Sequence, residues 1–137
     1  GTGTQRRLAV ELSQCMDRVA HMRGQVLCIA TTEQVFEIHQ RLLAPHRFRA
    51  LVHIPQPTAA ELRAMIDLYL EGRSNVTPDE VDSLLASCSK LARFTPAVVV
   101  ELVKEAAVCA VRGGRGSINR HDLQQALRGV RVPEAED

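Results

Sequence analysis

Val26-Leu27-Cys28-Ile29-Ala30-Thr31-Thr32 is the stretch that says most about the architecture of this chain. Residues 25–30 are apolar and rich in β-branched side chains without polar alternation, which is typical of a parallel strand covered on both faces. A second apolar segment, 50–54, leads into Pro55-Gln56-Pro57. We therefore predict two parallel strands, at 25–30 and 50–54, that belong to one sheet.

Helical signals flank these two segments. From Arg6 to Met22, Leu8, Leu12, Cys15, Met16 and Val19 recur at helical spacing, which predicts a helix with one buried face. A short helical piece is expected at 38–43, ending before Pro45 because the residue preceding proline is pushed out of the α region.

The chain after Pro57 carries four helix-start signals. Thr58, Thr77, Thr95 and Asn119 stand at N-cap positions; the first two are followed three residues later by Glu and Asn119 by Asp, and Pro follows Thr77 and Thr95 directly. These signals predict a four-helix bundle. The expected fold class is α/β followed by all-α, with an incomplete α/β part at 1–57, a helical subdomain at 58–132 and a frayed acidic tail at 133–137.

Composition narrows the class of protein. The formal charge is +1, from 17 basic and 16 acidic residues, so no global pull toward nucleic acid or an anionic membrane is expected. Its four cysteines lie far apart in apolar patterns, which indicates buried thiols in a reducing compartment rather than disulfides or a metal site. The five histidines lack ligand spacing, so no metal is expected. No run of about 18 apolar residues is present.

The order helix, strand, Arg-Phe, strand, Pro and capped helices resembles the second half of an AAA+ ATPase module of the FtsH and proteasomal kind. The segments around Thr31 and Arg47 are similar to the second region of homology of that family. Leu102 to Val111, with Asp122 and Leu123, is similar to the last two helices of its lid. The resemblance implies two strands of a P-loop sheet followed by a four-helix lid.

The motifs that handle phosphate in this family are absent from the 137 residues. No Gly-x-x-x-x-Gly-Lys-Ser/Thr loop occurs, and Lys90 and Lys104 follow Ser and Val rather than Gly. We therefore expect that this chain alone does not hydrolyse ATP, and that ATP and Mg²⁺ bind only with a missing half or a neighbouring subunit. The start at Gly1, without Met, is expected to be an excised or processed end.

Three places depart from the family pattern. Glu33, next to Thr32, stands where the family carries a sensor Asn; a carboxylate there would repel phosphate oxygens. Of two finger arginines, the first place is Ala44 and only Arg47 remains. It is either a finger that acts on the neighbour's nucleotide in trans or an arginine that pairs with an interface carboxylate. The family's Gly-rich adenine contact in the lid is Phe94, Thr95, Pro96 and Ala97 here, and the proline removes an N–H.

Two functions from different classes remain open. One is a portion of an oligomeric motor that remodels or unfolds proteins, to which this chain contributes subunit contacts and a lid. The other is a non-enzymatic assembly subunit built on a degenerate AAA+ remnant. A relative of DNA initiators or clamp loaders is less favoured by the balanced charge. The expected partners are the chain that completes the sheet, ring neighbours and a protein substrate. An intracellular location is expected, in the cytosol, an organelle matrix or a membrane-associated complex.

Overall fold

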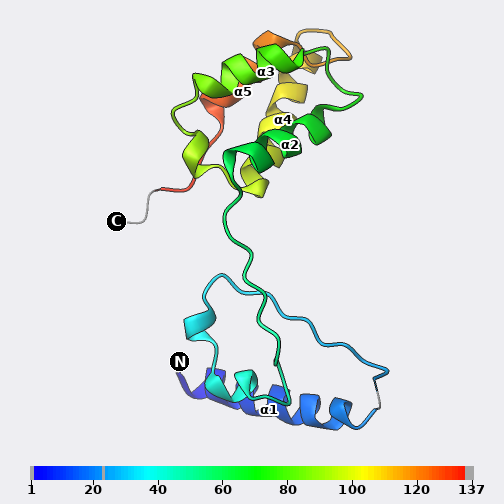
Figure 1. The fold of residues 1–137 in the computed structure, drawn as a ribbon, viewed down its shortest axis with the longest axis vertical. Coiled ribbons are helices and arrows are strands. Elements are labelled where there is room, and N and C mark those ends of the chain that lie inside the picture. The colour runs from blue at the N-terminus through cyan, green and yellow to red at the C-terminus, as the bar shows by residue number, and fades with distance from the viewer. Residues whose placement is uncertain (1, 23, 135–137) are drawn as a thin grey trace. The chain divides into compact units, whose positions relative to one another are not determined.

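The computed structural model describes residues 2–22 and 24–134. The chain divides into two compact units, Gly1–Ile54 and Pro55–Asp137 (Figure 1). Helices account for the regular structure of both units, and the single β feature among the described residues is an isolated bridge.

The first unit contains the long helix α1, Thr2–Ala20, and two short 3-10 helices, η1 at Val35–Glu37 and η2 at Gln40–Leu43. The α1 helix contacts η2. The predicted helix at 6–22 is thus present as α1, whereas the piece predicted at 38–43 contains only the 3-10 helix η2, which is tighter and shorter than an α-helix.

The buried stripe of α1 agrees with the prediction at Met16 but otherwise differs from it. Ala9, Ser13 and Met16 are its buried residues, at spacings of four and three, while Leu8 and Leu12 are 60% and 45% exposed. The difference arises because α1 packs on one small element only, so one flank of its apolar surface has nothing to pack against. Leu8 and Leu12 instead line an open groove of about 920 Å³ between α1 and the 37–42 segment.

The two predicted strands do not form in the described part of the chain. Residues 25–30 and 50–54 have no strand assignment, and no backbone group of 26–31 or 50–54 makes a backbone hydrogen bond there. Their apolar side chains face solvent, with Leu27 and Val52 both 83% exposed. A strand is stable only when a neighbour pairs with its N–H and C=O groups, and among the described residues neither segment has such a neighbour.

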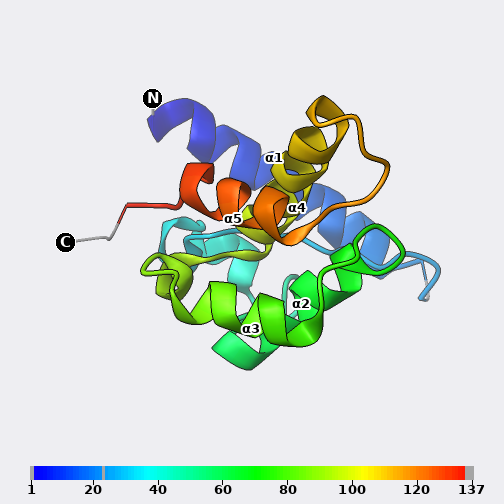
Figure 2. The same ribbon diagram turned by 90° about the horizontal axis from the view of Figure 1, so that it is seen from above.

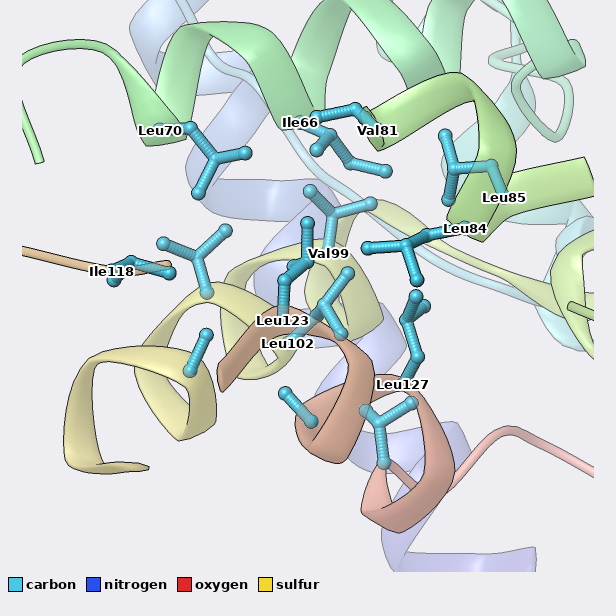
Figure 3. Close-up of a cluster of buried hydrophobic side chains, with 14 of the residues drawn as sticks. Ile66, Leu70, Val81, Leu84, Leu85, Val99, Leu102, Ile118, Leu123 and Leu127 are labelled. Carbon is cyan, nitrogen blue, oxygen red and sulfur yellow. The ribbon is translucent and has the colours of Figure 1, made fainter. Parts of the chain in front are cut away.

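The second unit holds α2 (Ala59–Leu70), α3 (Pro78–Ala86), the 3-10 helix η3 (Leu91–Arg93), α4 (Pro96–Arg112) and α5 (Arg120–Gly129). The α4 helix packs against both α2 and α5, and α3 contacts α5, as Figure 2 shows from above. In the centre, Ile66 of α2, Val99 and Leu102 of α4 and Leu123 of α5 are nearly inaccessible to solvent (Figure 3).

Each capping signal in the sequence opens one of these helices. Thr58, Thr77 and Asn119 make complete capping boxes, in which the side chain accepts from the N3 backbone N–H and the N3 carboxylate accepts from the cap's own N–H. Thr95 caps α4 by accepting a hydrogen bond from the N–H of Val98 at 3.3 Å. These contacts are local in sequence, so the residue pattern alone determines them.

Two loops of the second unit are joined by a parallel β-bridge between Ser74 and Ile118. The Ile118 N–H donates to the Arg73 carbonyl at 2.9 Å, and the Asn75 N–H donates to the Ile118 carbonyl at 3.0 Å. The bridge fixes the loop after α2 against the loop that precedes α5.

Candidate functional site

Arg47 lies at the centre of an ion-pair cluster in the first unit. Its Nε and Nη2 donate to the two carboxylate oxygens of Asp17 at 3.1 and 3.0 Å, and its Nη1 donates to the carbonyl of Arg41. His46 Nε2 lies 3.5 Å from the same Asp17 carboxylate. This paired geometry is the strong, directional form of an arginine–carboxylate contact.

Hydrogen bonding between the two side chains lowers the pKa of Asp17 and raises the pKa of Arg47, so both stay charged over the range in which most proteins work. The Arg47 side chain is only 13% exposed. Three of its five N–H groups are engaged inside the unit. Arg47 therefore holds the loop after η2 against the last turns of α1.

The segment predicted to act as a sensor is an exposed loop. Thr32 Oγ1 accepts a hydrogen bond from the Gln34 N–H at 3.1 Å, which is a local turn contact. Glu33 is exposed and makes no ion pair within the described residues. The sensor roles given to Thr32 and Glu33 stay predictions.

The lid positions Phe94 to Ala97 run from the end of η3 into the first residues of α4. Phe94 is 1% exposed and is part of the core of the second unit. Thr95 is the N-cap and Pro96 is the first helical residue, which supplies no N–H, while Ala97 is exposed. Free N–H groups at the start of a helix attract phosphate. Here Pro96 supplies no N–H and the Thr95 side chain occupies another, so fewer remain free. A nucleotide role for these residues stays a prediction.

Sequence reasoning missed the partners of two arginines. Asp17 stands 30 residues before Arg47, and nothing local links them. In the second unit, Arg115 Nη2 donates to the Asp122 carboxylate at 2.5 Å, and Asp122 is 2% exposed. Asp122 was identifiable as a capping residue, but its second role as the partner of Arg115 depends on how the 113–119 loop folds back.

The cysteine prediction is partly wrong. Cys15 and Cys28 are exposed and Cys88 and Cys109 are half-buried, all as free thiols. Cys28 is exposed because its segment, 25–30, was expected to be a buried strand but has no neighbouring strand to pair with. In the parts of the chain that the structure covers, no group of three or more His, Cys, Asp or Glu residues is arranged to hold a metal. No described helix has the length and apolar character needed to cross a bilayer.

Comparison with known proteins confirms the resemblance to classic AAA+ ATPases, since the homologues of this chain are enzymes of that class. They include proteasome-activating nucleotidase 2 of Haloferax volcanii, 30% identical over 104 residues, which is 76% of this chain and 24% of that protein. The ATP-dependent zinc metalloprotease FtsH 1 of Sphaerobacter thermophilus is 33% identical over 114 residues, 80% of this chain and 16% of the protease.

A third relative aligns with almost the whole chain. The proteasome-activating nucleotidase of Sulfurisphaera tokodaii is 26% identical over 134 residues, which is 96% of this chain and 33% of that protein. The chain thus spans between about a sixth and a third of the length of these relatives. No protein-family model matches it.

Proposed function

We propose that this chain forms the second half of an AAA+ module in an oligomeric machine that remodels or unfolds proteins. Its own contribution is a subunit contact around Arg47 and a helical lid at 58–132. ATP and Mg²⁺ are bound only together with a P-loop supplied by other residues of the machine. The names of the relatives, an ATP-dependent protease and a proteasome-activating nucleotidase, support this general kind of activity.

One observation carries the proposal. Two apolar segments, 26–30 and 50–54, are extended, unpaired and exposed within the described chain, with Ile29 at 79% and Ile54 at 86% exposure. Single exposed apolar residues are ordinary on protein surfaces, but two whole segments that are mainly apolar and exposed are not. In this proposal they flank a P-loop strand that other residues of the machine supply.

The groove beside α1 also supports the proposal that the first unit is completed by a sheet. Leu8 and Leu12 border it, and its lining is mainly apolar. A sheet that included both extended segments would bury apolar surface at about 25 cal/mol per Å². The first unit is therefore expected to gain most of its stability from the missing sheet, whereas the second unit already has a closed core.

A second function, non-enzymatic assembly, is favoured by a specific contact. Arg47 is occupied by Asp17 within its own unit and has only two N–H groups left for a neighbour. In this alternative the AAA+ remnant serves only to join subunits, and the machine's ATP turnover does not depend on it.

The two functions are separated by an experiment on the native assembly. The complex is isolated through a tag on this chain, its polypeptides are sequenced by mass spectrometry, and its ATP turnover is measured with wild-type chain and with the Arg47→Ala variant. A trans-acting finger predicts a P-loop protein in the complex and a fall in kcat of about 10³-fold or more. Unchanged turnover, or a complex without any P-loop, supports the assembly role.

The chain alone gives a simpler control. Calorimetric titration of the 137-residue protein with ATP and Mg²⁺ is expected to show no binding. Micromolar affinity for ATP in this titration would contradict the requirement for an external P-loop.

A further inference from the structure

Charge is unevenly distributed over the second unit, although the whole chain carries a formal charge of only +1. Residues 55–82, with α2 and the start of α3, contain six acidic and two basic residues. Residues 83–134, with η3, α4 and α5, contain eight basic and four acidic residues. Two of these four acids are paired within the unit, Glu101 with Lys104 and Asp122 with Arg115. The balanced total charge therefore conceals a basic half of the second unit.

The α5 helix presents a continuous polar face at the surface of this basic half. Its opposite side packs into the core through Leu123 and Leu127 (Figure 3). At 3.6 residues per turn, the exposed and half-exposed polar side chains of α5 fall within an arc of about 140°. They are Arg120, His121, Gln124, Gln125 and Arg128, which we call the α5 face. Each of these side chains can donate hydrogen bonds and none is acidic.

Two further arginines flank the ends of the α5 face. Arg112 is exposed at the end of α4, from which the 113–119 loop leads to the start of α5. Arg131 is exposed shortly after α5 ends. Neither arginine has an ion-pair partner among the residues that the structure describes. The remaining acids of residues 83–134, Glu105 and Glu134, lie on α4 and in the tail rather than on α5.

The chemistry of the α5 face favours a nucleic acid over a protein partner. Protein–protein interfaces have an apolar core, and none of the five side chains of the α5 face is apolar. Protein–DNA interfaces are more polar and much more positively charged. The face contains one histidine and no Phe, Tyr or Trp, so it is poorly suited to stack successive bases of a single strand. A duplex is therefore the favoured ligand.

The dimensions of α5 suit duplex DNA rather than duplex RNA. Its ten residues give a length of about 15 Å. The major groove of B-DNA is about 12 Å wide and admits an α-helix, whereas the major groove of duplex RNA is too deep and narrow for side chains to read. Glutamine amides pair with adenine edges and arginine guanidinium groups pair with guanine edges in the major groove of DNA.

We propose that the α5 face binds in the major groove of duplex DNA. The amides of Gln124 and Gln125 contact base edges, and the two arginines of the face and the two flanking arginines lie against phosphates on both sides of the groove. Four such contacts predict binding about 100-fold weaker at about 200 mM salt than at about 50 mM salt. The proposal uses neither Arg47 nor the extended segments, so it stands or falls separately from the proposed function.

Two paired substitutions in the full chain test the contact, with fluorescence anisotropy of a short labelled DNA duplex of mixed sequence as the measurement. The wild type is expected to bind with micromolar affinity at low salt. Gln124→Glu with Gln125→Glu keeps the shape of both side chains but places carboxylates against the DNA, so binding should be at least about tenfold weaker. Arg112→Gln with Arg131→Gln should reduce the slope of log K against log salt by about 2.

Matched controls change the same charges elsewhere. Gln5→Glu with Gln56→Glu and Arg7→Gln with Arg49→Gln alter exposed positions outside the α5 face and its flanks, and both should bind DNA as the wild type does. Far-UV circular dichroism checks that every variant is folded, which is expected because all the substituted side chains are exposed or half-exposed.

Unlabelled competitors distinguish the kinds of partner. Duplex DNA should displace the probe at lower concentration than single-stranded DNA of the same length, duplex RNA or a polyglutamate peptide. Wild type that does not bind duplex DNA at low salt, folded variants of the α5 face that bind as the wild type does, or stronger competition by polyglutamate or by the single strand would overturn the proposal.

Discussion

The Asp17 carboxylate and the Arg47 guanidinium meet through two hydrogen bonds, of 3.1 and 3.0 Å, across 30 residues of sequence. This pair and the Arg47 bond to the Arg41 carbonyl tie the η2 loop to the end of α1. The same arginine is the candidate for contact with a neighbouring subunit, so its structural engagement and its proposed function compete for one side chain.

Replacing Asp17 by Asn is expected to loosen the η2 loop. The amide offers one acceptor oxygen instead of two and carries no charge, so the paired geometry with Arg47 is lost. Hydrogen exchange of the 40–48 backbone should become faster, as measured by mass spectrometry. Glu11→Gln, on an exposed position of the same helix, is the control and should leave exchange in that loop unchanged. Equal exchange in Asp17→Asn and wild type would show that the pair does not hold the loop.

Acid should release the same loop. The hydrogen bond from Arg47 holds the pKa of Asp17 below its ordinary value in the folded state. A depressed folded pKa means that the stabilisation is fully present above the unfolded pKa, about 3.9, and is lost as the pH falls through the lower folded pKa. Carbon NMR of the Asp17 carboxyl should show this low midpoint, and Arg47→Gln should return it toward the ordinary value. A midpoint unaffected by Arg47→Gln would argue against this cause.

Asp122 is expected to matter more for stability than other first-turn acids. It completes a capping box with Asn119 and pairs with Arg115 while 2% exposed. Burial raises its pKa, but the hydrogen bonds from Asn119 and Arg115 outweigh this and lower it overall. Asp122→Ala should destabilise the second unit by about 1 to 3 kcal/mol in denaturant unfolding. Asp79→Ala, at an exposed first-turn position of α3, should cost no more than about 1 kcal/mol.

Gly113 and Arg115 should be coupled energetically. A Cβ at Gly113 would overlap the guanidinium of Arg115, so Gly113→Ala must shift the side chain that pairs with Asp122 and is expected to weaken that pair. In an Arg115→Ala background the overlap and the ion pair are both gone, and Gly113→Ala should cost little more. A double-mutant cycle should give a coupling of about 0.5 to 3 kcal/mol. Gly116→Ala, which meets no atom within 4 Å, should show no coupling to Arg115.

The two lysines should differ in their effect on stability. Lys90 Nζ donates to the carbonyls of Arg128 and Val130 at 3.1 and 3.3 Å, at the C-terminal end of α5, where a positive charge is favourable. Lys90→Met is expected to lower the unfolding free energy by about 1 kcal/mol. Lys104 pairs with Glu101 at an exposed site, and Lys104→Met should change stability by at most about 0.5 kcal/mol. Equal losses would mean that the carbonyl contacts of Lys90 contribute little.

The helices of the second unit could be read from the sequence because their start signals are local. Thr58, Thr77 and Asn119 contact residues three positions away, so the pattern of a few neighbouring side chains is enough to locate each helix start. The structure adds the 3-10 helix η3, whose residues carry no such signal.

The structure of the α/β part could not be predicted in the same way, because its stability depends on pairing with residues outside each segment. Apolar, β-branched residues at 25–30 and 50–54 show what these segments are suited to, but a strand forms only with a paired neighbour. The buried face of α1 depends on its packing partner as well, which explains why Ala9 and Ser13 are buried while Leu8 and Leu12 are not.

The candidate site also combines a residue that the sequence identifies with contacts that only the structure reveals. Arg47 was identifiable from the family resemblance of its segment, whereas Asp17 became visible as its partner only in three dimensions. The nucleotide roles of Thr32, Glu33 and the Phe94–Ala97 segment remain predictions, since they require a phosphate-binding half that the 137 residues do not contain.

The exposed side chains of Leu27, Ile29, Val52 and Ile54 also affect how long the chain survives in a cell. Chaperones and proteases act on extended apolar polypeptide, and their action shifts the steady-state abundance of any protein that presents it. A copy whose two segments are paired in a sheet buries these side chains, whereas an unpaired copy exposes them to chaperones and proteases. In the proposed assembly, quality control would thereby match the amount of this chain to the supply of the residues that complete its sheet.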